Sequence, residues 1–213
     1  MGKVTEQMSV WSGQFGQDYT DRNLMSLEEM ESTCQAMYGM TMTDIYTRLI
    51  GQCDRAIKIL EVACNVGNQL LCLQQMGFAR LYGIELQQYA VEIAKSRTKA
   101  INIIQATAFD IPFKDQYFDL VFTSGLLIHI SPDDIAEALT EIYRCSSRFI
   151  MGCEYFSPSY ETLSYRDNTD LLWKTDFASL YLSHFPDLKL VQKIMLPIKG
   201  SDNLSAAFLL EKT

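Results

Sequence analysis

The chain has 213 residues, of which 48% are hydrophobic and 21% are charged, and its formal net charge at pH 7 is −8. This composition predicts one soluble domain over residues 1–213, and the negative charge weighs against nucleic acid as a partner, because nucleic-acid affinity depends on Lys and Arg. No apolar run reaches the roughly 18 residues that span a bilayer. The first residues lack the apolar core of a signal peptide, so we expect a cytoplasmic location and no membrane partner.

The cysteines and histidines show no metal-binding pattern. The chain has six cysteines and two histidines, and no two cysteines have the C-x-x-C spacing of a zinc or redox motif. No cluster of acidic residues has the spacing of a carboxylate metal site. We therefore expect reduced cysteines in the core and no metal ion.

The N-terminal part of the chain, residues 1–53, predicts an N-terminal helical arm, made of an arm that could fold over the cofactor and two helices. The string over residues 11–23 combines two glycines with aromatic and polar residues, which predicts an ordered, partly extended arm. The expected helices cover residues 25–38, which end at Gly39, and residues 43–53, which are capped by Thr43 and Asp44.

Residues 54–154 alternate between strand-like and helix-like segments. The strand segments are nearly continuous apolar runs, as expected where helices cover both faces of a sheet. Ser131 and Pro132 open one helix, as a capping serine and a proline at the first position. Repeated strand–helix units predict an α/β fold with a doubly wound, Rossmann-like sheet. The expected strands are 57–62, 80–85, 101–106, 117–123 and 148–154, and the expected helices are 68–76, 87–98 and 132–145.

The last part, residues 155–213, is expected to form a substrate-side segment and to close the sheet. Residues 155–172 are rich in Tyr, Ser, Pro and Asp and predict an irregular segment, which a helix over 174–184 follows. Two strands, 188–196 and 204–211, are joined by a connection short enough for an antiparallel hairpin. The complete sheet would then have about seven strands.

The stretch from Ile57 to Asn68, I-K-I-L-E-V-A-C-N-V-G-N, carries the first sign of a ligand. An apolar strand turns at once into a helix, and such a turn directs the free backbone N–H groups and the positive dipole end of the helix at a ligand. Glu61 places an acid in this strand, and the turn ends in Asn65-x-Gly67 rather than the G-x-x-G of the nicotinamide fingerprint. Both features favour S-adenosylmethionine, because the class I methyltransferases that use it carry E/D-x-G-x-G-x-G at this point.

Two residues replace the first glycines of that pattern. Ala63 adds only a methyl group where the methionine portion of the cofactor would approach. Asn65 can keep the turn, because asparagine tolerates the left-handed backbone conformation. We therefore expect a retained and slightly narrower pocket.

A second acid stands in register with the first motif. Glu85 follows Glu61 by 24 positions (85 − 61) and ends the next predicted strand. A carboxylate at that place can accept both ribose hydroxyls of a cofactor. An acid at the end of a strand is common by itself. Glu85 indicates a cofactor site because it stands at the expected distance from the first motif.

A third segment follows the third predicted strand. Residues 106–113 and 117–121 resemble the methyltransferase pattern g-D-a-x-d-L-P-F…F-D-x-V. Thr107 aligns with the acid that usually reads the adenine amino group. Thr107 or Asp110 could take that role, and Ala108-Phe109 could flank the base.

With these segments in register, the chain resembles the class I S-adenosylmethionine-dependent methyltransferases over about residues 57–154. A narrower resemblance, to the pseudaminic acid biosynthesis-associated methylases, spans nearly the whole chain. It is carried by F-G-x-x-Y-x-x-R-N over 15–23, by L-I-H-I over 127–130 and by the tail over 165–177. It implies methylation of a sugar or nonulosonic-acid intermediate of pseudaminic acid type, with S-adenosyl-L-methionine as cofactor and S-adenosyl-L-homocysteine as product.

Other functional classes are alternatives to this one. A small-molecule natural-product or amino-acid N- or O-methyltransferase fits the same motifs, and a non-catalytic cofactor-binding partner protein is an alternative of another class. Nucleic-acid amino-methyltransferases carry [D/N]-P-P-[Y/F] after the fourth strand, where this chain has Ser124-Gly125-Leu126-Leu127. The sequence leaves the acceptor, the methylated atom and the oligomeric state undefined.

The predicted site combines a candidate base with cofactor and substrate residues. His129 is the candidate general base, because it follows the fourth strand at the edge where doubly wound sheets bind ligands; a substrate contact or a structural role are the alternatives. Arg22, in the arm, would pair with the methionine carboxylate. The predicted cofactor-binding residues are Tyr19, Arg22, Glu61, Ala63, Asn65, Gly67, Asn68, Glu85, Leu86, Thr107, Ala108, Phe109, Asp110 and Ser124. The predicted substrate-binding residues are Tyr155, Tyr165 and Arg166.

Overall fold

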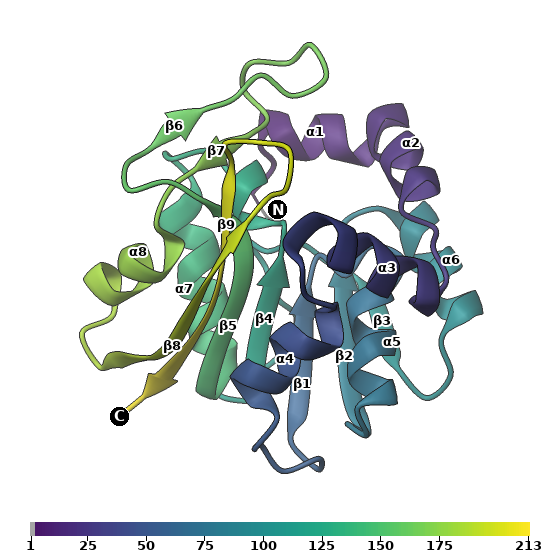
Figure 1. Cartoon of the computed structure of the whole chain (residues 1–213), viewed down its shortest axis with the longest axis vertical. Coiled ribbons are helices and arrows are strands. Elements are labelled where there is room, and N and C mark those ends of the chain that lie inside the picture. Colours follow the sequence, from purple (N-terminus) through teal and green to yellow (C-terminus); the bar gives the residue numbers. More distant parts are fainter. Residues whose placement is uncertain (1–2) are drawn as a thin grey trace.

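The structure, a computed structural model, describes residues 3–213, and within them seven strands form one sheet (Figure 1). The elements are α1 (Glu6–Ser12), α2 (Gln14–Arg22), α3 (Leu27–Tyr38), α4 (Met42–Ile50), β1 (Lys58–Val62), α5 (Asn68–Gln75), β2 (Arg80–Glu85), α6 (Gln88–Arg97), β3 (Asn102–Gln105), β4 (Phe118–Ser124), the 3-10 helix η1 (Leu127–His129), α7 (Ile135–Cys145), β5 (Ser146–Phe156), β6 (Glu161–Thr162), β7 (Trp173–Lys174), α8 (Phe177–His184), β8 (Leu188–Pro197) and β9 (Leu204–Lys212).

The strand order of the sheet is β3-β2-β1-β4-β5-β9-β8. The first five strands pair in parallel, whereas β9 runs antiparallel to both β5 and β8. This topology confirms the predicted α/β fold, with a doubly wound Rossmann-like sheet that a C-terminal antiparallel strand pair closes.

Helices cover both faces of the sheet, and each face has its own core. Ile45 of α4 and Leu70 of α5 are fully buried in the core on one face, to which α3 and α6 also contribute. Leu139 of α7 is fully buried on the other face, together with residues of α8. Successive side chains of a strand point to opposite faces, so Phe122 of β4 packs in the first core and Val121 in the second. Burial on both faces explains the continuous apolar runs of the strands.

The N-terminal arm is helical, as the predicted fold class has it, whereas the partly extended conformation expected over residues 11–23 is wrong. Thr5 caps α1 by accepting a hydrogen bond from the Met8 N–H at 3.1 Å, and Gly13 separates α1 from α2. A Cβ at Gly16 would lie 1.9 Å from the carbonyl oxygen of Trp11. The glycines therefore permit a tight corner between two helices. In Figure 1, α1 and α2 lie above the carboxyl ends of the central strands.

Other helices also begin at points that differ from the prediction. α4 is capped by Thr41 rather than Thr43. α7 begins only at Ile135, after a turn in which the carbonyl oxygen of Ser131 accepts hydrogen bonds from the backbone N–H groups of Asp134 and Ile135. α8 begins later than predicted because Asp176 caps it. The segment after β5, predicted to be irregular, contains β6, which pairs with β7.

Two whole-chain properties complete the fold. All six cysteines are free, and four of them are buried, which agrees with their predicted role as reduced core residues. Within residues 3–213, none of the helices combines the length and the apolar character that a bilayer crossing requires.

Candidate active site

A cavity opens at the carboxyl ends of β1, β2, β3 and β4. Figure 1 shows α1 and α2 above these strand ends. The loops that follow these strands form its base and sides, and the two N-terminal helices cover it. Doubly wound sheets bind their ligands at this edge. The predicted site residues that line the cavity are Tyr19, Ala63, Asn65, Asn68, Glu85, Leu86, Thr107, Ala108, Phe109, Ser124 and His129.

The turn between β1 and α5 is built from left-handed residues. Ala63, Asn65 and Gly67 have φ angles of 63°, 45° and 80°, and the Gly67 N–H donates to the Cys64 carbonyl oxygen at 2.8 Å. A non-glycine residue in this conformation costs about 1–2 kcal/mol, so backbone strain is concentrated beside the cavity. Gly67 shapes the turn but does not line the cavity. A Cβ at Gly67 would point to Thr98, which also lies outside the lining, and would be 3.3 Å from its Cγ2 atom.

Glu85, at the end of β2, joins two loops of the cavity. One carboxylate oxygen accepts a hydrogen bond from the Asn65 N–H and the other from the Gln87 N–H, both at 2.9 Å. Burial raises the pKa of Glu85 above its ordinary value, although these N–H donors oppose the rise. Each carboxylate oxygen retains a second lone pair. The carboxylate can therefore accept both hydroxyls of a ribose.

Two other acids that were predicted to bind the cofactor do not line the cavity. Glu61 is buried in β1, and one of its carboxylate oxygens has no hydrogen-bond partner in the described part of the chain. Burial, and then the charge of Glu85, raise the pKa of Glu61 well above its ordinary value, which favours the neutral acid. Asp110 is exposed. Its neighbours Thr107 and Phe109 face the cavity, joined by a 3.1 Å hydrogen bond from the Phe109 N–H to the Thr107 hydroxyl oxygen.

His129 ends η1, the short helix that follows β4. Its Nδ1 lies 2.6 Å from the carbonyl oxygen of Leu171; because a carbonyl only accepts, Nδ1 carries the proton and Nε2 is the acceptor nitrogen. Burial lowers the pKa of His129 to about 4, so the ring is neutral at neutral pH. The carboxylate of Glu154 accepts the Leu126 N–H at 3.3 Å, immediately before η1, and so supports the segment that carries His129.

Hydrogen bonds fasten α1 and α2 to the loops of the cavity. Nε2 of Gln87 donates to the carbonyl oxygens of Trp11 and Gly13, at 3.1 Å each. The Thr20 hydroxyl donates to the side-chain oxygen of Asn65 at 3.0 Å. Sequence reasoning missed Trp11, Thr20 and Gln87 as lining residues. The first two belong to the string over 11–23, which was itself a signal, whereas the partners of Gln87 are backbone atoms 74 and 76 residues away.

Comparisons with known proteins agree with this arrangement. Residues 60–148 match a family model described as a methyltransferase domain. An O-methyltransferase of Aspergillus nomiae is 33% identical over 111 residues, which are 48% of this chain and 48% of that protein. An uncharacterized methyltransferase of Synechocystis sp. is 30% identical over 87 residues, 41% of each chain. The chain thus spans less than half the length of these curated relatives.

Solved structures match a larger part of the chain. The 1,6-didemethyltoxoflavin-N1-methyltransferase of Burkholderia thailandensis, with bound S-adenosylhomocysteine, is 14% identical with a TM-score of 0.74 and covers 100% of this chain and 93% of its own. The magnesium protoporphyrin IX methyltransferase of Synechocystis, with bound S-adenosylmethionine, is 12% identical with a TM-score of 0.70 and covers 100% of both. This chain has the fold of a class I methyltransferase.

In this methyltransferase fold, the segment that matches the family model supplies the loops after β1, β2, β3 and β4, which carry Glu85 and His129. The match includes neither the string over 15–23 nor the tail over 165–177, which carry the narrower family resemblance. That narrower resemblance therefore stays a prediction.

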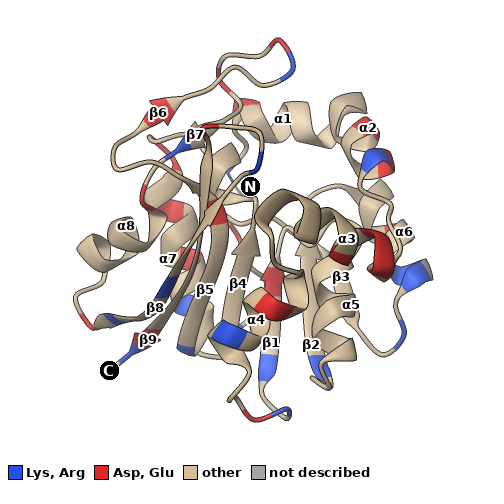
Figure 2. Ribbon diagram, in the orientation of Figure 1, with Lys and Arg blue, Asp and Glu red and all other residues tan. Residues whose placement is uncertain are grey.

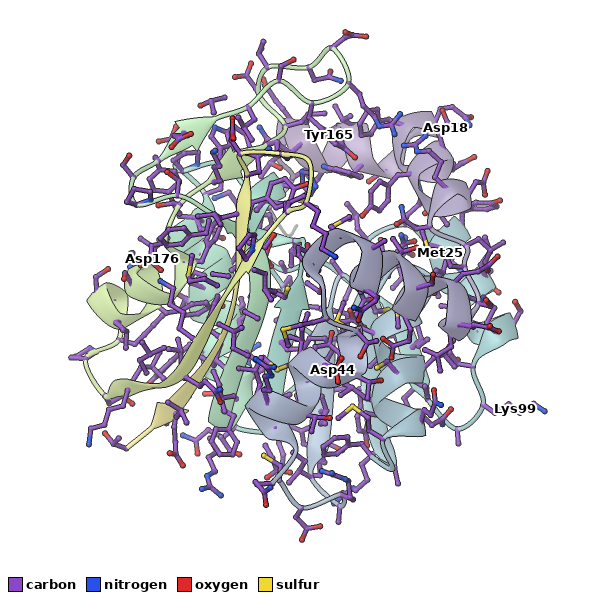
Figure 3. All side chains as sticks on the ribbon, viewed as in Figure 1. Asp18, Met25, Asp44, Lys99, Tyr165 and Asp176 are labelled. Carbon is purple, nitrogen blue, oxygen red and sulfur yellow. The ribbon has the colours of Figure 1, made fainter. Side chains whose placement is uncertain are left out.

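Four further predicted residues lie outside the cavity of the methyltransferase fold: Arg22, Tyr155, Tyr165 and Arg166. Arg22 and Arg166 are exposed. Tyr165 lies beside α1 (Figure 3), and its ring centroid is 6.5 Å from that of Trp11 and 5.5 Å from that of His129. The structure thus brings Tyr165 to the rim of the site and leaves the two arginines in solvent.

Proposed function

We propose that the protein is an S-adenosylmethionine-dependent methyltransferase that acts on a small molecule. The observation that carries this proposal is the Glu85 carboxylate, held by the backbone N–H groups of Asn65 and Gln87 at the edge of the cavity. A carboxylate so placed suits the vicinal hydroxyls of a ribose. The strained turn at Ala63 and Asn65 leads directly into α5, whose N-terminus suits a negatively charged group.

The other lining residues fit the remaining parts of this cofactor. Leu86, Ala108 and Phe109 offer apolar and aromatic surface for adenine, and Thr107 offers a hydroxyl for its amino group. Arg22 is exposed, so it does not suit the methionine carboxylate as predicted. The N-terminus of α5 is the better candidate for binding this carboxylate.

The bound cofactor would supply an electrophilic methyl group on its sulfonium sulfur. The protein then has to position the acceptor in line with that methyl group and to remove a proton from it. His129 suits the second task, because it lines the cavity and because Leu171 fixes the Nδ1–H tautomer, which leaves Nε2 as a proton acceptor. The covering helices would exclude water from the reaction.

Two acceptor classes remain as candidates. The narrower family resemblance favours a sugar or nonulosonic-acid intermediate of pseudaminic acid type. The relative named as an O-methyltransferase favours a hydroxyl group as the methylated atom, whatever the molecule that carries it. A natural product or an amino acid fits the second class.

Turnover tests the proposal. The protein is incubated with S-adenosylmethionine and a panel of nonulosonic acids, their nucleotide-activated forms, amino sugars, amino acids and hydroxylated aromatic compounds, and products are scored by mass. A compound that gains one methyl group while S-adenosylhomocysteine forms would support the proposal. Cofactor binding without any product across the panel would favour the non-catalytic partner protein. Failure to bind the cofactor would overturn both.

A further inference from the structure

We propose that the methyl acceptor is an uncharged small molecule that presents a hydroxyl group on a flat ring, bound at Trp11 and His129. The inference rests on the methyltransferase function proposed above and specifies its substrate class. Three properties of the cavity carry it: the charges of its lining, its aromatic surface, and the hydrogen-bonding groups of Trp11 and His129.

The lining of the cavity provides no positive charge for an anionic acceptor. Among the residues that line it within the described chain, Glu85 is the only acid, and no Lys or Arg is present. Lys3 lies 5.3 Å from the centroid of the Phe109 ring, but its ammonium is paired with Asp134 at 2.8 Å and Glu137 at 2.5 Å. The N-terminus of α5 suits one negative group, which the proposed function assigns to the cofactor. A carboxylate or phosphate of the acceptor would lose its hydration elsewhere in the cavity without gaining a cationic partner.

Arg97 stands behind the lining, where its guanidinium donates to the carbonyl oxygen of Val66 and to Oδ1 of Asn68. Several other positive residues lie away from the cavity. Lys58 and Arg80 begin β1 and β2, at the ends opposite the cavity, where Figure 2 shows them in blue. Arg22 and Arg166 are exposed. A nonulosonic acid carries a carboxylate, so the charge distribution favours an uncharged acceptor over that class.

Trp11 is the centre of an aromatic cluster, of which Trp11, Tyr19 and His129 line the cavity. Its ring meets those of Phe15 and Tyr19 edge-on, with centroids 5.2 Å apart in both pairs. Its ring plane is tilted by 57° against that of His129, with the ring centroids 4.6 Å apart. It stacks on the ring of Tyr165, with the centroids 6.5 Å apart. Flat aromatic faces bind flat rings through stacked and edge-on contacts.

One polar group each of Trp11 and His129 favours a hydroxyl on that ring. Nε1 of Trp11 is a buried donor without a hydrogen-bond partner in the described chain. Nε2 of His129 is an acceptor, because Nδ1 donates to Leu171. A hydroxyl both accepts from an indole N–H and donates to an imidazole nitrogen. A carboxylate has no hydrogen for His129, and an ammonium group has no lone pair for Trp11.

The same groups balance the reaction. The acceptor oxygen forms a bond to the methyl carbon while the carbon–sulfur bond breaks, and the sulfur keeps the electron pair. The hydroxyl proton passes to Nε2 of His129 and from there to water when the product leaves. The products are a methyl ether and S-adenosylhomocysteine.

Isothermal titration of the protein loaded with S-adenosylhomocysteine tests the substrate class. The probes are 2-naphthol, its carboxylated analogue 6-hydroxy-2-naphthoate, and N-acetylneuraminic acid. We expect 2-naphthol to bind about tenfold more tightly than either anion, or about 1.4 kcal/mol. Equal or tighter binding of either anion, or no binding of 2-naphthol, would overturn the inference.

A pair of tryptophan variants tests the contact itself. Trp11→Phe keeps an aromatic ring and removes the N–H, so it should weaken 2-naphthol binding by about three- to tenfold and leave the affinity for S-adenosylhomocysteine unchanged. Trp173→Phe is the matched control, because Trp173 is the other tryptophan of the chain, is buried in β7 and does not line the cavity. In that control Trp11 is the remaining tryptophan, and its fluorescence should change when 2-naphthol binds. Wild-type affinity in Trp11→Phe would contradict the role of Nε1.

The titrations separate two kinds of failure. If S-adenosylhomocysteine binds and 2-naphthol does not, the substrate inference is wrong and the proposed methyltransferase function stands. If S-adenosylhomocysteine itself does not bind, the proposed function is wrong and the inference falls with it.

Discussion

The hydroxyl group of Thr20 donates a hydrogen bond to the side-chain oxygen of Asn65 across 3.0 Å. Thr20 belongs to α2, and Asn65 belongs to the turn after β1, so the bond connects the covering helices to the base of the cavity. The backbone N–H of Asn65 also donates to Glu85. A ligand at Glu85 and the covering helices therefore act on one turn, and each is expected to favour the binding of the other.

Replacing Thr20 by valine should loosen the covering helices. The change keeps the shape of the side chain and removes the hydroxyl, which donates to Asn65 at 3.0 Å and lies within 3.4 Å of the side-chain oxygen of Gln87. This interaction is largely buried and is worth about 1 kcal/mol. Trypsin cleavage after the exposed Arg22 should then be about threefold to tenfold faster, and deletion of residues 1–23 should abolish turnover. Thr33→Val is the control, because the Thr33 hydroxyl bonds only within α3. Equal cleavage of the Thr20→Val variant and the wild type would show that this bond does not hold the helices.

Removing the imidazole of His129 should impair turnover far more than cofactor binding. We expect His129→Ala to lower kcat by about 100-fold or more, because a positioned proton acceptor contributes at least that much. The affinity for S-adenosylhomocysteine should change by less than about twofold. His184→Ala, at the exposed end of α8, is the matched control. Full activity of the His129→Ala variant would dismiss His129 as the base.

The burial of His129 also predicts how stability depends on pH. Folding lowers the pKa of His129 from 6.5 to about 4, so below pH 6.5 the unfolded chain binds a proton that the folded chain does not. This contribution to stability is complete above pH 6.5 and is lost as the pH falls towards 4, by about 3 kcal/mol. Urea unfolding at pH 6.5 and at pH 4 should therefore show a larger loss of unfolding free energy for the wild type than for His129→Gln. Equal losses would contradict the burial of a neutral imidazole.

Glu154 predicts the opposite dependence on pH. Burial raises its pKa from 4.5 to about 7, even though Thr123 and the N–H groups of η1 oppose the rise. The folded chain thus keeps a proton that the unfolded chain releases above pH 4.5. Relative to Glu154→Gln, the wild type should lose about 3 kcal/mol of stability between pH 4.5 and pH 7. Glu92→Gln, on an exposed side of α6, should show no such difference, and a flat profile for Glu154 would refute its burial as an acid.

The sheet was predictable because its strands are apolar on both faces and each ends in a turn. β4 illustrates this: its run of buried side chains gives the strand, and its parallel pairing follows from the intervening helices. The exact placement of the covering helices was not predictable. α1 buries none of its residues, so its sequence lacks an apolar stripe, and its position depends on Gln87, far along the chain.

The candidate site was predictable where spacing along the backbone determines position. Glu85 and the turn at Asn65 follow directly from strand ends, and both line the cavity. Arg22 shows the limit of this reasoning. Tyr19 and Asn23, one helical turn apart, face the cavity, whereas Arg22 lies on the exposed side of the same helix. Which side of α2 faces inward depends on its packing against other elements, and a single sequence does not encode that directly.

Binding of S-adenosylmethionine to the purified protein, measured by isothermal titration, tests the central claim most directly. One molecule should bind per chain. Glu85→Ala should weaken binding by about 1–3 kcal/mol, because the ribose hydroxyls lose a charged partner, while Glu92→Ala should bind like the wild type. Absence of binding to the wild type, or unchanged affinity in Glu85→Ala, would contradict the account of this cavity as a cofactor site organised by Glu85.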